Sequence, residues 1–290
     1  MVEHRLSWAQ AFVIVLFFLA SAVGCMLLAG AIRGLGTHAP ISASLEIVTQ
    51  DPINILLAQA TATIVSLVVS IRWLKIDDWI KAVAIRAASP RIIALAMIAG
   101  IALQFPLTEL TNVLYLWFPL DVEEQLAYQR LLHPDNWLIA MVTAVAIVGV
   151  APIGEELLFR GLIFRGLCPT YRPVGAVLVS ALLFGFAHMG PIRFIYATIV
   201  GVILAILLFR TDSILPCIAC HAAFNAVPLL LPSSVFRIPG FNTVSAEVEH
   251  LPWPLLALST LFFLAAFLLA IRRPLTASDR PSDSGVDLSP

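Results

Sequence analysis

Long apolar runs separated by short polar connections make up most of the chain. Because an α-helix needs about 20 mostly apolar residues to cross a bilayer, runs of this length are typical of membrane spans. The fifth run is short and adjoins the sixth across Gly190 and Pro191, a pair that commonly marks a turn. The pattern predicts an all-α, polytopic transmembrane helical bundle of about eight spans. The eight runs are Trp8–Ile32, Ile53–Ile71, Ile92–Phe118, Trp137–Cys168, Val174–Met189, Ile192–Phe209, Ile214–Leu231 and Trp253–Ile271.

The composition indicates that a membrane, rather than water, surrounds this chain. Its 290 residues are 60% hydrophobic and 12% charged, with a mean hydropathy of +0.96, whereas about a quarter of the residues of a soluble protein are charged. These values exclude a water-soluble globular enzyme and a disordered protein. The 17 Lys and Arg residues against 18 Asp and Glu give a net charge of -1, so no nucleic-acid partner is expected. Membrane lipids are the expected surroundings.

The first apolar run and the cysteines bear on processing and redox chemistry. The run Trp8–Ile32 is longer than the apolar part of a signal peptide, which has about 7–15 residues, so we expect an uncleaved first membrane helix. All four cysteines lie in or beside apolar runs, so a disulfide framework of the secreted type is not expected. They are Cys25, Cys168, Cys217 and Cys220.

The Lys and Arg residues indicate how the bundle is oriented. With the N-terminus inside, 13 of the 17 fall on the inner side, a count that includes Arg160. Since loops rich in Lys and Arg stay in the cytoplasm, both termini are expected to be cytoplasmic, in a multi-pass protein of a prokaryotic cell membrane. The four outer residues are Arg33, Arg130, Arg193 and Arg237.

Four parts of the chain differ in character, and no internal repeat is found. Residues 1–136 hold three predicted spans without a recognisable motif, and residues 137–232 hold the polar groups described next. Residues 233–271 comprise an outer loop and the last span. Residues 272–290 are rich in Ser, Asp and Pro, which predicts a disordered cytoplasmic tail.

Six polar residues interrupt the apolar runs of the second half. Each charged group near the centre of a bilayer costs about 2.5–3.5 kcal/mol. Such a cluster is expected only where the groups pair, line a wet cavity or carry out chemistry. The six are Glu155, Glu156, Arg160, His188, His221 and Asn225.

The first group has the pattern Glu155-Glu156-x-x-x-Arg160. On a helix, Glu156 and Arg160 share a face and can pair. Glu155 points about 100° away and is free to face something else. A salt bridge at a helix end is the alternative; it explains Glu156 and Arg160 but not Glu155.

The other two groups are Phe184-x-x-x-His188 and His221-x-x-x-Asn225. Phe184 is expected to pack, and a lone histidine is often a packing residue as well. His221 and Asn225 share a face and could hold an oxyanion, or could join two helices by hydrogen bonds. Counting helical rise from the inner loops puts Glu155, His188, His221 and Asn225 within about 10 Å of the same depth. We therefore expect all four to face one cavity, opening on the cytoplasmic side.

A further pattern, Cys217-x-x-Cys220-His221, matches a haem-attachment motif. Covalent haem attachment needs an exposed peptide outside the cytoplasm, whereas this pattern lies in an apolar run near its inner end. A metal site made by these three residues is the other alternative. We expect packing cysteines, because a buried free cysteine behaves as a small hydrophobic side chain.

Taken together and in this order, the three groups resemble the CPBP (Abi) family of CAAX proteases and bacteriocin-processing enzymes, which are polytopic intramembrane endopeptidases. The resemblance covers Trp137–Leu231. It implies that Glu155 and His188 activate a water, and that His221 and Asn225 stabilise the oxyanion. Glu156 and Arg160 would support them. The implied substrates are membrane-associated proteins or peptides, such as prenylated or leader-bearing ones.

Members of this family have been described both as metalloproteases and as metal-independent glutamate proteases. The sequence lacks His-Glu-x-x-His, the usual zinc-helix signature. We favour no cofactor, because Asn225, on the same helix face as His221, suits an oxyanion donor better than a metal ligand. Zinc is the alternative, and Glu155, His188 and His221 would then be its ligands.

Two non-protease functions compete with this interpretation. In a transporter, the buried Glu and His residues would form a path for protons or ions. Glu109, near Gln104 and Pro106, fits that function better, but a transporter commonly carries an internal repeat. A non-catalytic membrane scaffold is the third alternative, which the intact motif residues disfavour.

Overall fold

The computed structural model describes residues 4–118 and 122–272, and this part of the chain is helical without a strand. Six helices are long and apolar enough to cross a membrane, as expected of an integral multi-pass membrane protein. Two further apolar helices, Pro173–Ala187 and Leu215–Leu230, are shorter. The predicted all-α bundle is confirmed, but two of its eight predicted spans are therefore short. Apart from Arg272, the predicted disordered tail lies outside the described residues.

The helices follow one another through the chain with short connections. In order they are α1 (Trp8–Thr37), α2 (Ile41–Gln50), α3 (Pro52–Trp73), α4 (Trp79–Ala82), α5 (Pro90–Leu114), α6 (Val122–Leu132), α7 (Trp137–Ala144), η1 (Val145–Val150), α8 (Ala151–Glu155), η2 (Glu156–Phe164), α9 (Arg165–Leu167), α10 (Pro173–Ala187), α11 (Pro191–Thr211), α12 (Leu215–Leu230) and α13 (Trp253–Ile271). The segments η1 and η2 are π-helical turns within one long helix that runs from Trp137 to Leu167.

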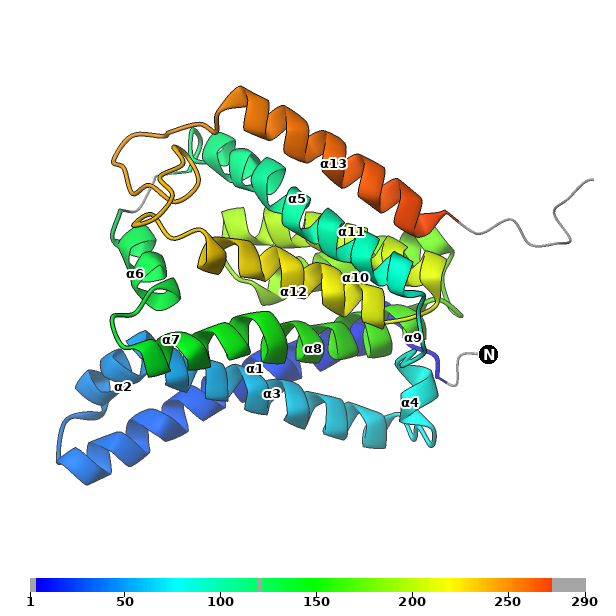
Figure 1. Ribbon diagram of the computed structural model, residues 1–290. Helices are drawn as coiled ribbons and strands as arrows, with labels where there is room; N and C mark the ends of the chain where they lie inside the picture. Colours follow the sequence, from blue (N-terminus) through cyan, green and yellow to red (C-terminus); the bar gives the residue numbers. More distant parts are fainter. Residues whose placement is uncertain (1–3, 119–121, 273–290) are drawn as a thin grey trace, which may run out of the picture.

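The helix 137–167 runs through the middle of the bundle (Figure 1). On one side it packs against α3, which in turn packs against α1. On the other side it packs against α12. In turn, α12 packs against α5, and α5 packs against α13. The hairpin of α10 and α11 covers its second half. Polar side chains on this central helix therefore meet side chains of α3, α10, α11 and α12 rather than lipid.

Close packing of α5 on α12 depends on Gly100. A Cβ atom at this position would lie 2.1 Å from the carbonyl oxygen of Cys220. Only glycine lets the two backbones come so near, and this approach positions the turn of α12 that carries His221.

The first π-helical turn, η1, results in part from Pro152. In η1 the N–H of Ala151 bonds to the carbonyl oxygen of Ala146, five residues before it. The next such bond would need an N–H at position 152, which proline lacks. The carbonyl oxygen of Ile147 is therefore left without its partner inside the helix. Such π-helical turns are frequent at functional sites, and the sequence-based prediction of a regular helix missed them.

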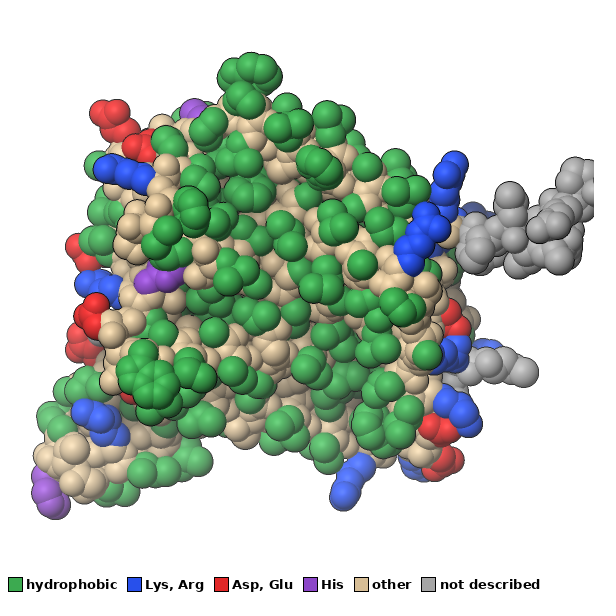
Figure 2. Space-filling model, viewed as in Figure 1, with side chains coloured by type: hydrophobic (Ala, Val, Ile, Leu, Met, Phe, Trp, Pro, Cys, Tyr) green, Lys and Arg blue, Asp and Glu red, His purple; other side chains and the backbone are tan. Residues whose placement is uncertain are grey.

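The two ends of the bundle carry different charges. At the end with α4 and α9, Leu6 N–H donates to the carbonyl of Gly166 over 2.7 Å, and Asp212 pairs with both Arg86 and Arg165. Lys and Arg side chains gather at this end (Figure 2). The opposite end holds α6 and the connection between α12 and α13 (Figure 1).

Candidate active site

Glu156 and Arg160 form a fully buried ion pair on the central helix. Both residues are 0% exposed, and an Arg160 nitrogen lies 3.0 Å from Glu156 Oε1. The guanidinium also lies over the ring of Phe184, 4.0 Å from its centre. Arg160 was placed among the inner loop residues from the sequence, and this assignment is wrong because the side chain is enclosed in the protein.

Glu156 has a second partner that the sequence did not indicate. Its Oε1 atom lies 2.8 Å from Nδ1 of His221, on α12. Because a carboxylate only accepts, Nδ1 carries the proton and donates it. The other ring nitrogen, Nε2, then faces Glu155, with 3.9 Å between Nε2 and Oε2 of that residue. Glu156 therefore fixes both the position and the rotation of the His221 ring.

Glu155 is buried, and its two oxygens have different surroundings. Gln59, on α3, donates from Nε2 to Glu155 Oε1 over 2.5 Å. The other oxygen, Oε2, has no hydrogen-bond partner among the described residues. An enclosed carboxylate oxygen without a donor is costly in a folded protein, and such atoms are found where a substrate or water is to be bound.

His188 ends α10, at the start of the turn into α11. Its Nδ1 lies 2.8 Å from the carbonyl oxygen of Phe184, so Nδ1 donates and Nε2 keeps its lone pair in the neutral ring. The ring packs edge-on against Phe184, with 4.5 Å between the ring centres, and lies 6.4 Å from the ring of Tyr196. Phe184 packs, as expected, and orients His188.

Asn225 lies one helical turn beyond His221. Its Nδ2 donates to the carbonyl oxygen of Ile147 over 3.0 Å. This is the carbonyl left without an internal partner by Pro152. One of the two amide protons is thereby used, and the second remains for another acceptor.

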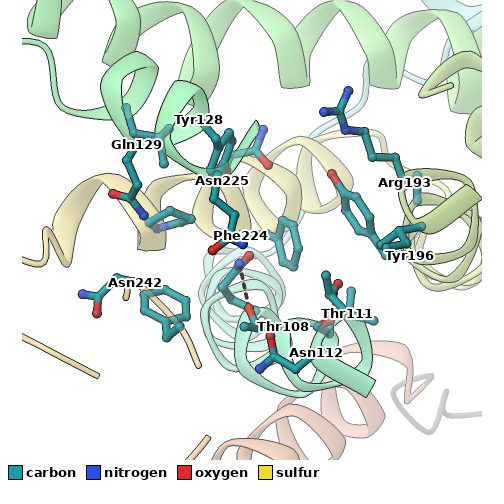
Figure 3. A pocket seen from close by; sticks show the side chains of 18 of the residues that line it. Thr108, Thr111, Asn112, Tyr128, Gln129, Arg193, Tyr196, Phe224, Asn225 and Asn242 are labelled. Carbon is teal, nitrogen blue, oxygen red and sulfur yellow. Dashed lines mark hydrogen bonds between the residues drawn. The ribbon is translucent and has the colours of Figure 1, made fainter. Parts of the chain in front are cut away.

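Glu155, His188, His221 and Asn225 all line one cavity of about 510 Å³. Its walls come from α3, α5, α6, η1, α8, α10, α11, α12 and the connection after α12. Figure 3 shows part of this lining, with labelled side chains of α5, α6, α11, α12 and that connection. Much of the lining that surrounds the four residues consists of amide and hydroxyl side chains. These include Gln104, Thr108, Thr111, Asn112, Gln125, Gln129 and Asn242.

Residues 136–227 match the family model of the type II CAAX prenyl endopeptidases described as Rce1-like. This part of the chain is therefore an Rce1-like domain. The Rce1-like domain contains the six polar residues singled out from the sequence and agrees with the resemblance drawn from their spacing. No curated protein and no solved structure matches the chain.

The Rce1-like domain does not contain every residue of the cavity. Gln59 lies outside it, in the part of the chain where the sequence showed no motif. The signal that could have identified Gln59 is a long polar side chain within an apolar run, but nothing local in the sequence links it to Glu155.

The lining of the cavity extends to one end of the bundle. Besides α5 and α6, the cavity is lined by Arg193, at the start of α11, and by residues 240–245 and 247–249. These segments lie at the end opposite α4 and α9 (Figure 1). None of the described lining residues lies at the end with α4 and α9, which is the end that the sequence-based expectation places in the cytoplasm.

Glu109, the residue that fitted a transporter function better than a protease function, has a structural role. It accepts hydrogen bonds from the N–H of Leu251 over 2.9 Å and from Nδ1 of His250 over 2.6 Å. Asn112, on the same helix, donates to the carbonyl of Gly240 over 2.8 Å. These contacts fasten the connection after α12 to α5.

Metal ligation was considered for two sets of residues. Within residues 4–118 and 122–272, no group of three or more His, Cys, Asp and Glu side chains has the spacing to hold a metal ion. Cys217 and Cys220 are both buried, and the thiol of Cys217 donates to the carbonyl of Leu204 over 3.4 Å.

Proposed function

We propose that the chain is an intramembrane endopeptidase that hydrolyses peptide bonds of membrane-associated substrates. Membership of residues 136–227 in a family of endopeptidases supports a protease in general. The observation that carries the catalytic assignment is the convergence of Glu155, His188, His221 and Asn225 on one cavity. Within the described part of the chain, Glu155 Oε2 has no hydrogen-bond partner.

Glu155 acts as the base in this proposal. A water in the cavity gives a proton to Oε2 while the Gln59 amide holds Oε1 in place. His188 accepts the second hydrogen of the water at Nε2, because its Nδ1 proton is bound to the Phe184 carbonyl. The water oxygen then attacks the peptide carbonyl carbon, and the carbonyl oxygen becomes an oxyanion.

His221 and Asn225 stabilise this oxyanion. Asn225 contributes the amide proton that Ile147 does not use, and the imidazolium form of His221 contributes its Nε2 proton. Glu156 balances the positive charge of that imidazolium. Donors held in place in a dry site act strongly on a developing charge, because they need no reorganisation as it forms.

Collapse of the tetrahedral intermediate completes the reaction. The C–N bond breaks, the proton held by Glu155 passes to the leaving nitrogen, and the acyl part leaves as a carboxylic acid. Glu155 returns to its ionised form. Every proton of the attacking water is thereby accounted for, and this chain's own side chains carry each transfer.

The substitution Glu155→Gln tests the proposal. Glutamine preserves the shape of the side chain but cannot take a proton as a carboxylate does, so cleavage should stop while the protein still inserts. Newly formed peptide termini would be compared in membranes containing the wild-type chain and the variant. Cys220→Ala, on the face of α12 that packs in the core, should retain cleavage. Cleavage at the normal rate by Glu155→Gln would show that the base lies elsewhere.

A further inference from the structure

Charged side chains distinguish the two ends of the bundle. Apart from the enclosed Arg160, ten of the described Lys and Arg residues lie at the end with α4 and α9, and four lie at the cavity end. The ten at the end with α4 and α9 are Arg5, Arg72, Lys75, Lys81, Arg86, Arg91, Arg165, Arg172, Arg210 and Arg272. The four at the cavity end are Arg33, Arg130, Arg193 and Arg237.

Contacts between distant segments show that the ten belong to one surface. Ile214 N–H donates to the carbonyl of Ala84 over 3.0 Å, which joins the α11–α12 turn to the segment before α5. The Nε atom of Arg210 donates to the carbonyl of Ile271 over 3.1 Å, which joins the ends of α11 and α13. Asp212 contacts Arg165 from the end of the central helix.

The opposite end, where the cavity is lined, carries acidic residues at its rim. Glu247 and Glu249 both line the cavity. The hydroxyl of Thr243 and the N–H of Gly240 donate to Glu249, which lowers the pKa of that carboxyl and keeps it ionised. At the rim, these two carboxylates accompany Arg193, which also lines the cavity, and Arg237, which acts on Glu249, so this end lacks the excess of Lys and Arg found at the other end.

Lys and Arg in short loops stay on the cytoplasmic side of a membrane. Applied to the ten-to-four division, this rule makes the end with α4 and α9 cytoplasmic, together with both ends of the described chain. We propose that the catalytic cavity opens on the extracytoplasmic face, and that its substrates are peptide segments of membrane-anchored proteins on that face. The substrate half of this inference rests on the proposed function. Prenylated carboxyl-terminal tails, which are made in the cytoplasm, would not reach the cavity.

The lining also indicates how such a segment is held. Gln104 Oε1 and Gln125 Nε2 are enclosed atoms without a hydrogen-bond partner among the described residues. One accepts and the other donates, as the N–H and C=O groups of an extended peptide require. Main-chain recognition of this kind suits a cavity that accepts more than one sequence.

Sidedness is tested by labelling with a maleimide that does not cross membranes. Ala246→Cys places a thiol beside the cavity rim, and Asp77→Cys places one at the other end; both positions are exposed. In intact cells Ala246→Cys should label as fully as after permeabilisation, whereas Asp77→Cys should label only after permeabilisation. The unsubstituted chain, with its four cysteines, gives the baseline. The reverse labelling pattern would overturn the proposal, whatever the activity of the protein.

The substrate half is tested by mapping the peptide termini that disappear in Glu155→Gln membranes. They should lie in extracytoplasmic segments of anchored proteins. Termini confined to cytoplasmic segments would overturn this half even with the expected labelling. If no terminus depends on Glu155, the proposed function and the substrate class fail together, while the labelling still decides the sidedness.

Discussion

Gln59 holds one oxygen of Glu155 and leaves the other free, so it is expected to position the base. Gln59→Met removes the donor at nearly constant volume. Hydrogen bonds to charged groups contribute about 1.5–3 kcal/mol, so kcat should fall by about 10- to 100-fold with a smaller change in KM. Steady-state kinetics on a cleaved peptide would measure the two effects separately.

Ser66→Ala is the matched control for Gln59→Met. Ser66 lies on the same helix, is buried, and its hydroxyl has no hydrogen-bond partner among the described residues. Its removal should leave kcat unchanged. If Gln59→Met raises KM and spares kcat, Gln59 contacts the substrate rather than the base.

Glu156 serves both His221 and Arg160, and these two functions can be separated. Glu156→Gln leaves the enclosed guanidinium without its counter-charge, which typically costs about 3–5 kcal/mol, and it also weakens the support of the imidazolium. We expect lower thermal stability and partial loss of kcat. Adding Arg160→Met should restore most of the stability but not the activity. Recovery of both would mean that Glu156 acts only by neutralising Arg160.

Asn225 could act as an oxyanion donor or only as a polar contact between helices, and one substitution distinguishes these two roles. As an oxyanion donor, its replacement in Asn225→Ala should lower kcat by about 10²–10³. Loss of the contact with Ile147 should lower the melting temperature only modestly, because one neutral hydrogen bond contributes about 1 kcal/mol. A large fall in melting temperature with kcat within about tenfold of normal would favour the polar contact instead.

At the scale of helices, the apolar runs predicted the elements well. The apolar run Val174–Met189 corresponds to α10, which spans Pro173–Ala187. The helix begins at Pro173, because proline is favoured in a first helical turn. It ends before the turn that contains Gly190, whose φ of 88° favours glycine. The π-helical turns were missed, since a regular period of about 3.6 residues was assumed. Contacts between helices, such as that of Glu156 with His221, leave no trace in local patterns.

Gly100 makes the most demanding contact between two helices. In Gly100→Ala the added Cβ would meet the Cys220 carbonyl oxygen, a backbone atom that cannot turn away. α5 and α12 must then separate, at a cost of about 1–3 kcal/mol or more. Thermal unfolding in detergent should show the loss, accompanied by lower activity because α12 carries His221.

Gly24→Ala provides the comparison for Gly100→Ala. Gly24 lies inside α1, and no atom lies within 4 Å of a Cβ built there. Alanine is the better helix former by about 1 kcal/mol, so this variant should be as stable as the wild type or more so. Equal destabilisation by both substitutions would show that close packing is not the cause.

At the scale of the whole molecule, the sequence predicted that four side chains converge but not where the cavity opens. Helical rise fixes relative depth along parallel or antiparallel helices, so His188 and His221 could be placed near one level. Which end is open depends on α6 and residues 240–249, which carry no apolar pattern. By contrast, the unequal distribution of Lys and Arg between the two ends was predicted from the sequence, except for the enclosed Arg160.

Asp212 joins segments from across the molecule and gives the last prediction. It pairs with Arg165, whose side chain is only 9% exposed, and with Arg86, and it ends α11 with φ of 51°. Asn tolerates this left-handed backbone, so Asp212→Asn removes the charge and preserves the turn. Because the Asp212 side chain is 60% exposed, screening limits the loss of folding free energy to about 1 kcal/mol, or about 2–4 °C in melting temperature.

Asp78→Asn is the control for Asp212→Asn. It removes the charge of an exposed pair with Lys81 and should change the melting temperature little. Equal effects of the two substitutions would show that the junction at Asp212 does not stabilise the end with α4 and α9.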